Sequence, residues 1–219
     1  MTLEKKSACK VNMLLNVLGP REDGFHELET VLHPINLHDT LTFEGIKNGI
    51  QFTCSDPALP TDSKNLVYRA ARNFLNQVPL SDGVKIHLEK KIPLAAGLGG
   101  GSGNAATTLL GLNEFFNSPF SATQLQEMAA ELGSDIPFFL QNKPALATGR
   151  GEKIQPLDFF PALRGIYILL AHPGFGIPTA WAYQQLANFP EALNGKKGRA
   201  EKLISRLRKS DLAEAAQEF

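Results

Sequence analysis

A run of glycines that leads directly into a helical pattern is the part of the chain best suited to chemistry. It reads Pro93, Leu94, Ala95, Ala96, Gly97, Leu98, Gly99, Gly100, Gly101, Ser102, Gly103, Asn104, Ala105 and Ala106. Because glycine has no Cβ, such a backbone can adopt positive φ angles and point successive N–H groups at one place. A helix that starts there adds the positive end of its dipole. The segment therefore predicts an anion site, and a phosphate is the natural ligand.

Three well-known motifs describe this segment poorly. No lysine follows the glycines, so the Walker pattern of P-loop nucleotide hydrolases is absent. Residues 101–106 satisfy G-x-G-x-x-A, but a Rossmann unit needs an acidic residue at the end of a second strand about 20 residues later. Residues 121–126 begin a helix instead, and the H-R-D and D-F-G elements of protein kinases are missing. Another class of phosphate-binding protein is indicated.

The composition is typical of a soluble globular protein. The 219 residues are 43% hydrophobic, enough for one large domain or two small ones, and 22 basic side chains balance 22 acidic ones. This balance argues against nucleic acid or an anionic membrane as a partner. Cys9 and Cys54 lack metal-ligand spacing and are expected to be buried, inert thiols. Since the amino terminus does not resemble a signal peptide, a cytoplasmic location is expected.

Strand patterns dominate the region before the glycine segment. Alternating apolar and polar residues predict a mainly antiparallel sheet with strands at residues 8–17, 25–32, 40–43, 50–53 and 84–88. The first two are expected to form a hairpin with a loop at 19–24. Asn65 is expected to cap one helix over residues 66–75, whose apolar residues share a face.

Helical patterns dominate the region after the glycine segment. A buried helix is expected to start at the loop and to end before Pro119. Ser121 and Gln124 have the form of a capping box for a second helix, which ends at Gly133. Further on, the pattern predicts strands at 145–148 and 165–171, a turn at 149–152, and helices at 179–186 and 199–207. The change of character near residues 149–154 marks the expected domain boundary.

Taken whole, residues 93–106 closely resemble the second motif of the GHMP kinases, the superfamily named for galactokinase, homoserine kinase, mevalonate kinase and phosphomevalonate kinase. Further segments resemble one branch of this family, which acts on a methylerythritol linked to cytidine diphosphate. They occur in the same order as in that branch, at residues 8–15, 23–28, 132–138 and 171–174. Their shared order argues against accidental similarity.

The resemblance implies a fold, a reaction and its ligands. The implied fold is α+β with two lobes, an ATP-binding lobe at residues 1–152 that is similar to a ribosomal-protein domain and an incomplete α/β substrate-binding lobe at residues 153–219. The implied reaction is phosphorylation by ATP, with Mg²⁺, of the 2-hydroxyl of 4-diphosphocytidyl-2-C-methyl-D-erythritol in non-mevalonate isoprenoid biosynthesis. A monomer or weak homodimer is expected. Two alternatives stay open, namely a GHMP kinase for homoserine or mevalonate and a catalytically silent chain that only binds nucleotide.

By the family pattern, Lys10 and Asp135 form the catalytic pair. Asp135 would accept the proton of the attacking hydroxyl or orient that hydroxyl, and Lys10 would keep the aspartate ionised and stabilise charge on the transferred phosphoryl group. The alternative is structural, because Lys10 could end an edge strand in solvent and Asp135 could cap the following turn.

The same pattern implies the binding residues. The nucleotide would contact Asn65, Lys90, Pro93, Leu94, Ala95, Ala96, Gly97, Leu98, Gly99, Gly100, Gly101, Ser102 and Gly103, with the Ser102 hydroxyl offered to a phosphate or to Mg²⁺. Relatives usually have a second serine in place of Gly103, so one hydroxyl contact is expected to be missing. For the substrate, Asn12 would contact hydroxyls, Phe25 and Tyr183 would stack on the cytosine, and His26 would read its edge.

The carboxy-terminal end departs most from the resemblance. Family members continue beyond the position of Phe219 with a third, glycine-rich motif and with strands that complete the second lobe. The sequence is therefore expected to be either a fragment of a longer protein or a natural short variant, and both alternatives stay open.

Overall fold

The computed structural model describes residues 2–78, 82–193, 195–209 and 212–218, which belong to two compact units. Unit 1 contains Met1–Cys9, Ile35–Pro93 and Leu98–Asn142, and unit 2 contains Lys10–Pro34, Leu94–Gly97 and Lys143–Phe219. The units are interleaved along the chain because two long strands, β1 (Thr2–Pro20) and β2 (His26–Ile46), contribute residues to both. The domain division expected near residue 152 stays a prediction.

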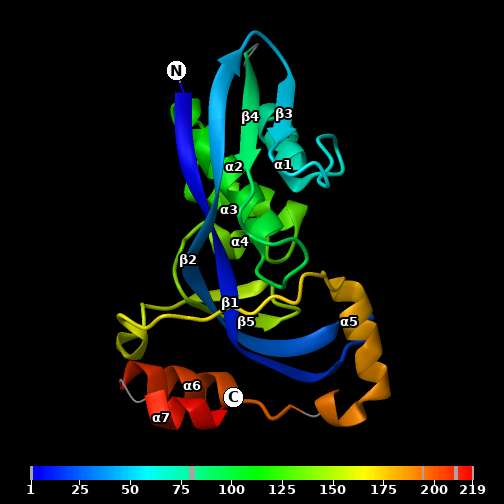
Figure 1. The fold of residues 1–219 in the computed structure, drawn as a ribbon, viewed down its shortest axis with the longest axis vertical. Coiled ribbons are helices and arrows are strands. Elements are labelled where there is room, and N and C mark those ends of the chain that lie inside the picture. Colours follow the sequence, from blue (N-terminus) through cyan, green and yellow to red (C-terminus); the bar gives the residue numbers. More distant parts are fainter. Residues whose placement is uncertain (1, 79–81, 194, 210–211, 219) are drawn as a thin grey trace. The chain divides into compact units, whose positions relative to one another are not determined.

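β1 and β2 form the predicted hairpin, and both strands are longer than the pattern indicated (Figure 1). At the hairpin turn the backbone N–H of Arg21 donates to the carbonyl of Phe25 at 2.8 Å, and Gly24 has a φ of 80°. Residues 40–43 are not a separate strand, because the extended backbone of β2 continues without a turn up to Ile46.

The sheet of unit 1 has the strand order β3-β4-β2. β4 (Gly83–Glu89) pairs with residues 40–46 of β2 in the predicted antiparallel sense, whereas β3 (Ile50–Cys54) pairs with β4 in parallel. The parallel pair follows from the connection, since the chain returns through helix α1 (Leu66–Leu75) instead of a tight turn. Asn65 caps α1 as expected, accepting the Val67 N–H at 2.9 Å.

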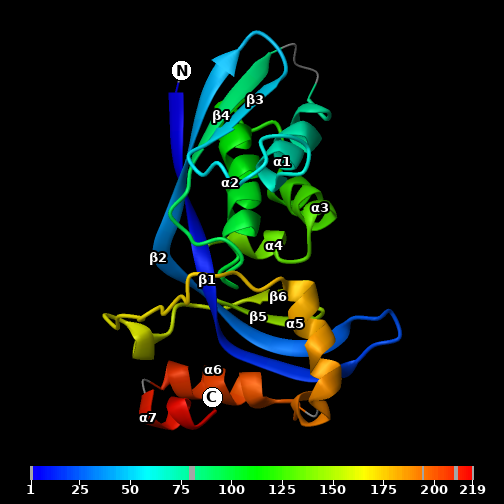
Figure 2. The ribbon, with the colours of Figure 1, turned by 45° about the vertical axis from the view of Figure 1, so that its right-hand side comes forward.

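Helices cover one face of this sheet, and Figure 2 shows them side by side. They are α1, α2 (Gly100–Phe115), α3 (Ala122–Leu132) and α4 (Ile136–Phe139), and they contact one another. Gly111 lets α2 approach the sheet, since a Cβ there would lie 2.6 Å from the Phe43 ring. The predicted capping box of Ser121 and Gln124 starts α3. α2 begins inside the glycine segment, at Gly100, in agreement with the helix expected to start at the loop.

In unit 2, β5 (Ala145–Gly149) pairs antiparallel with residues 28–32 of β2, and β6 (Lys153–Pro156) pairs antiparallel with β5. β5 and the turn after it are confirmed, whereas β6 was not predicted. The expected carboxy-terminal helices are present as α5 (Thr179–Gln185) and α6 (Arg199–Arg208), followed by the short α7 (Leu212–Ala215). Single 3-10 turns occur at Pro161–Leu163, Leu186–Asn188, Pro190–Leu193 and Ala216–Glu218.

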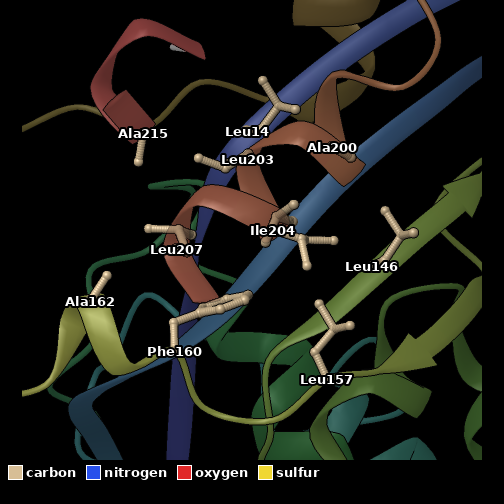
Figure 3. Packing of buried hydrophobic residues seen from close by; sticks show 11 residues of the cluster. Leu14, Leu146, Leu157, Phe160, Ala162, Ala200, Leu203, Ile204, Leu207 and Ala215 are labelled. Carbon is tan, nitrogen blue, oxygen red and sulfur yellow. The ribbon is translucent and has the colours of Figure 1, made fainter. Parts of the chain in front are cut away.

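The core of unit 2 forms where α6 packs on the strands (Figure 3). The strands contribute Leu14, Val31 and Leu146, and α6 contributes apolar side chains on one face. The remaining members come from the segment after β6 and from α7, and the cluster comprises Leu14, Val31, Leu146, Leu157, Phe160, Ala162, Ala200, Leu203, Ile204, Leu207 and Ala215. The helix periodicity of residues 199–207 therefore marked a true core-facing stripe.

The strand predicted at residues 165–171 is wrong, because the structure assigns no strand to this segment. Its apolar side chains are exposed instead, with Tyr167 at 98% and Leu169 at 94%. A strand pattern produces a strand only when a neighbouring strand accepts its backbone hydrogen bonds. Among the described helices, none is both long and apolar enough to cross a membrane.

Candidate functional site

The glycine segment has the backbone geometry that its composition predicts. Ala95, Gly97 and Gly99 have φ angles of 51°, 72° and 69°, and Gly99 is the left-handed N-cap of α2, without a side-chain cap. The first hydrogen bond of the helix runs from the Gly103 N–H to the Gly99 carbonyl at 2.8 Å. The N–H groups of the preceding residues, Gly100 to Ser102, therefore have no acceptor within the helix. Three donors without a helical acceptor therefore lie at the positive end of a 16-residue helix.

Two side chains add polar groups to this turn. The Ser102 hydroxyl is partly exposed and, within the described part of the chain, makes no hydrogen bond. The Lys90 ammonium lies 3.4 Å from the position that a Cβ of Gly100 would occupy. A cation and a hydroxyl thus accompany the N–H groups, which is a suitable arrangement for phosphate oxygens.

Lys90 is held in place by a buried carboxylate that sequence reasoning missed. Its Nζ donates to Asp39 Oδ2 at 2.5 Å, and Asp39 Oδ1 accepts the backbone N–H groups of Lys91 at 2.7 Å and Ile92 at 2.8 Å. Both side chains of the ion pair are buried. Asp39 therefore fixes the three residues that lead into the glycine segment. The available signal was an aspartate directly before the strand pattern at residues 40–43.

Gly103, the departure from the family pattern, is closely surrounded by main-chain and side-chain atoms. A Cβ at this position would lie 2.4 Å from the carbonyl oxygen of Ala8, 3.2 Å from Ser7 Oγ and 3.4 Å from a ring carbon of Phe139. The first of these distances is too short for any real Cβ, and its partner is a main-chain atom. Glycine is therefore required here by packing.

Lys10 lies inside unit 2 and not at a solvent-facing strand end, since it is only 9% exposed. Its Nζ donates to Asn12 Oδ1 and to the carbonyl of Gly97, each at 2.5 Å. Asn12 in turn donates to Thr30 Oγ1 at 2.7 Å. The structure thus brings together two predicted residues, Lys10 and Asn12, and ties the lysine to a carbonyl of the glycine segment.

Asp135 occupies the N-cap position of α4 but makes no side-chain cap, so the alternative expectation that it caps this turn is wrong. Its side chain is exposed and has no hydrogen-bond or ion-pair partner among the described residues. The carboxylate is available to a ligand. Asp135 belongs to unit 1 and Lys10 to unit 2, and their pairing stays a prediction.

Asn65 has a clear structural role. Besides capping α1, its side-chain amide donates to the carbonyl of Pro60 at 2.9 Å, and the residue is buried. The cap interpretation is confirmed, and a contact with nucleotide stays a prediction.

The predicted pyrimidine-binding residues form two ring contacts in unit 2. The rings of His26 and Tyr183 lie 5.4 Å apart, centroid to centroid, with an interplanar angle of 31°. Phe25 is 53% exposed, and its ring is covered by Arg150, whose Cζ lies 4.7 Å from the ring centroid. Sequence reasoning placed Arg150 in a turn but assigned it no role.

The turn that carries Phe25 is fixed by charged groups. The guanidinium of Arg21 donates to Asp23 at 3.2 Å and to Glu27 at 2.5 Å. The hydrogen bonds from Arg21 and from the Phe25 N–H lower the pKa of Asp23, against the opposing effect of desolvation. Asp23 therefore stays ionised, and its carboxylate holds Phe25 by accepting the backbone N–H of that residue. Among the described residues, no cluster of three or more His, Cys, Asp or Glu is arranged to hold a metal ion.

The comparisons with known proteins agree with this geometry. Residues 65–143 match the model of the GHMP kinases N terminal domain. The fold is similar to a homoserine kinase from Cytophaga hutchinsonii, with a TM-score of 0.71 at 18% identity over 99% of this chain and 70% of that one. It is also similar to a crystal structure of 4-(cytidine 5'-diphospho)-2C-methyl-D-erythritol kinase, with a TM-score of 0.64 at 36% identity over 85% of this chain and 72% of that chain. The predicted two-lobed GHMP kinase class is confirmed.

Relatives narrow the class further. A 4-diphosphocytidyl-2-C-methyl-D-erythritol kinase of Pelotomaculum thermopropionicum is 42% identical over 99% of this chain and 74% of its own length. The enzyme of the same name from a Synechococcus strain is 46% identical over 84% of this chain and 59% of its own length. The chain belongs to the 4-diphosphocytidyl-2-C-methyl-D-erythritol kinase family. It spans about three fifths of the Synechococcus relative.

Proposed function

We propose that this chain carries the nucleotide and substrate sites of a kinase that transfers a phosphoryl group from ATP to the 2-hydroxyl of 4-diphosphocytidyl-2-C-methyl-D-erythritol. The observation that carries the proposal is the first turn of α2, where three successive N–H groups lack a helical acceptor beside the Lys90 ammonium. The identity of the substrate that receives the phosphoryl group rests on family membership, since relatives named 4-diphosphocytidyl-2-C-methyl-D-erythritol kinase are 42–46% identical to the chain.

The phosphate end fits ATP with Mg²⁺. Phosphate oxygens accept from the N–H groups of Gly100 to Ser102, and the Lys90 charge adds to the helix dipole. Mg²⁺ is commonly bound by phosphates, water and one or two protein oxygens, and the Ser102 hydroxyl has no competing partner among the described residues. When bound, ATP supplies the phosphoryl group, and Mg²⁺ neutralises part of the phosphate charge.

The catalytic roles fall to Lys10 and Asp135. Asp135 orients the 2-hydroxyl and accepts its proton, which its exposed carboxylate is able to do. Lys10 stabilises negative charge on the transferred group, with its Nζ held by Asn12 and the Gly97 carbonyl. Because phosphoryl transfer has a loose transition state, positioning of the hydroxyl is the larger contribution of Asp135.

The substrate end uses the aromatic groups of unit 2. We assign stacking on the cytosine to Phe25, which is exposed, and to Tyr183, whose ring also contacts the His26 imidazole. Stacking on aromatic rings favours any base, so the cytosine preference depends on hydrogen bonds to its edge, which we assign to His26. Asn12 contacts hydroxyls of the methylerythritol, since its amide lies beside Lys10.

Calorimetry tests the substrate assignment directly on the chain of 219 residues. CDP should bind more tightly than UDP, because the two bases differ at the edge that His26 reads. Equal affinities for CDP, UDP and inorganic phosphate would reject the cytidine assignment and favour a kinase of the homoserine or mevalonate type.

An assay of ADP release tests the catalytic assignment. Asp135→Ala and Lys10→Ala should each lower the turnover rate by at least about 100-fold, the usual contribution of a group that acts on the transition state. Unchanged rates in both variants would reject these roles. ATP binding without any ADP release in the presence of the substrate would favour the silent nucleotide-binding alternative.

A further inference from the structure

The cation that covers Phe25 has no assigned role in the proposed reaction. Arg150 lies in the turn between β5 and β6, with its Cζ 4.7 Å from the Phe25 ring centroid. At that distance a guanidinium is attracted by the negative face of the ring. The contact joins the β5–β6 turn to the β1–β2 turn, which are far apart in the sequence.

The backbone of the β5–β6 turn holds Arg150 in position. Gly149 and Gly151 have positive φ angles of 73° and 106°, which fix a tight turn around the arginine. The Glu152 carboxylate accepts the Arg150 N–H at 2.6 Å. Burial would raise the pKa of Glu152, but backbone hydrogen bonds outweigh it and lower that pKa, so the carboxylate stays ionised. Arg150 is thus attached to a well-defined part of the sheet.

The carboxylates near Arg150 are bound by other groups, so its guanidinium contacts the Phe25 ring instead. Asp23 is already bound by Arg21 and by the Phe25 N–H, and Glu152 by the turn backbone. Both carboxylates act on the guanidinium of Arg150 through charge alone. Among the described residues, its guanidinium donates no hydrogen bond. The aromatic contact is therefore the one that defines where this side chain lies.

We propose that Arg150 is a positioning residue, which holds the Phe25 ring in the orientation that stacks a pyrimidine base. An exposed phenylalanine at a turn would otherwise exchange between rotamers, and each base-binding event would have to order it. With Arg150 over the ring, Phe25 is still 53% exposed, which leaves ring surface for a base to contact. The inference rests on the proposed substrate class, a cytidine nucleotide, and adds a residue that acts on the base through Phe25.

Binding of cytidine and CDP to Arg150→Ala tests the proposal. Both ligands should bind about two- to fivefold more weakly, and by the same factor, because the lost contact acts on the base and not on the phosphates. Arg150→Lys should recover part of the loss. The matched control is Arg164→Ala, which removes an exposed arginine of the same unit and should change neither affinity. A loss confined to CDP would make Arg150 a phosphate ligand and overturn the proposal, as would unchanged affinities.

A second readout needs no ligand. Trp181 is the single tryptophan of the chain, so Trp181→Phe with Phe25→Trp places the only indole at the stacking position. Adding Arg150→Ala should increase the fast component of its fluorescence anisotropy decay, whereas adding Arg164→Ala should not. An unchanged decay contradicts the positioning role. If the wild-type chain binds neither CDP nor cytidine, the proposed function and this inference fail together; if it binds both and Arg150→Ala changes nothing, the inference alone fails.

Discussion

Replacing Glu29 by glutamine should loosen α6 from the strands of unit 2. Glu29 lies on β2 and is only 4% exposed. Its Oε1 accepts the Asn16 side-chain amide at 2.9 Å and the Ala200 N–H at 3.1 Å, and its Oε2 accepts the Gly198 N–H at 3.1 Å. Since α6 begins at Arg199, after the left-handed Gly198, this carboxylate serves as an N-cap supplied by a distant strand.

The magnitude follows from what glutamine can and cannot replace. Its amide keeps the size of the side chain but turns one acceptor oxygen into an NH₂ group that faces backbone donors. A hydrogen bond to a charged group contributes about 1.5–3 kcal/mol, and a carboxylate at a helix N-terminus a further ~0.3–1 kcal/mol. We therefore expect Glu29→Gln to lower the free energy of unfolding by about 2–4 kcal/mol at neutral pH.

The pH dependence gives this prediction a distinctive signature. Burial would raise the pKa of Glu29, but the hydrogen bonds from Asn16, Gly198 and Ala200 outweigh it and lower the pKa in the folded state. A lowered folded pKa means that the stabilisation is fully present above the pKa of the unfolded chain, about 4.3 for glutamate. It is lost as the pH falls through the folded pKa, where the wild-type carboxylate becomes protonated.

Urea unfolding at a series of pH values measures both effects. The difference between wild type and Glu29→Gln should be constant near neutral pH and should shrink in acid. The control is Glu27→Gln, the same substitution two residues away on β2, where the side chain is partly exposed and pairs with Arg21. It should cost less than about 1 kcal/mol. A Glu29→Gln variant as stable as wild type, or a difference that does not change with pH, would refute the reasoning.

Three further predictions concern unit 1 and the exposed segment. Asp39→Asn should destabilise the chain by about 3–5 kcal/mol in urea unfolding, because it leaves a buried ammonium unpaired, whereas Glu44→Gln in an exposed pair should cost less than about 1 kcal/mol. Gly103→Ser should cost about 1–3 kcal/mol or more through overpacking, and Gly101→Ser little, since a Cβ there meets only a leucine methyl at 3.8 Å. Leu169→Lys should leave the unfolding free energy within about 0.5 kcal/mol and reduce light scattering at high concentration; an equal tendency to associate would contradict it.

Elements whose signals are local were predictable from the sequence. The Asn65 cap and the capping box at Ser121 depend on residues two or three positions apart, and both are present where the pattern placed them. The apolar stripe of α6 is equally local, and Leu203, Ile204 and Leu207 pack into the core of unit 2. In these cases the backbone and its nearest neighbours determine the outcome.

The sequence pattern missed the strand at residues 153–156 and wrongly predicted one at residues 165–171, because a strand forms only beside a partner strand. The short, polar β6 forms because β5 lies beside it, with Leu146 opposite Gln155. Residues 165–171 have the stronger strand composition, yet no described strand pairs with them. Hydrophobic periodicity indicates which side chains a segment could bury, but pairing with a neighbouring strand determines whether the segment forms a strand.

The candidate site shows the same division. Lys10 and Asn12 are two residues apart on one strand, and their side chains form a hydrogen bond. The partners that sequence reasoning missed are distant in sequence: Asp39 reaches Lys90 across 51 residues, and Arg150 comes to Phe25 from another turn. A motif identifies residues that contact a ligand. The side chains that position those residues come from distant parts of the chain and are brought near only by the fold.

Gly103 connects these two kinds of information. The family pattern predicts a serine hydroxyl at this position, so from the pattern alone Gly103 means that one contact with the phosphates is missing. In this chain the place of that side chain is filled from β1, with the Ala8 carbonyl 2.4 Å and Ser7 Oγ 3.2 Å from where a Cβ would lie. Ser7 Oγ is buried and has no hydrogen-bond partner among the described residues. The first turn of α2 therefore lacks one side chain but packs closely against the backbone of β1. This contact fixes the turn whose N–H groups we assign to phosphate.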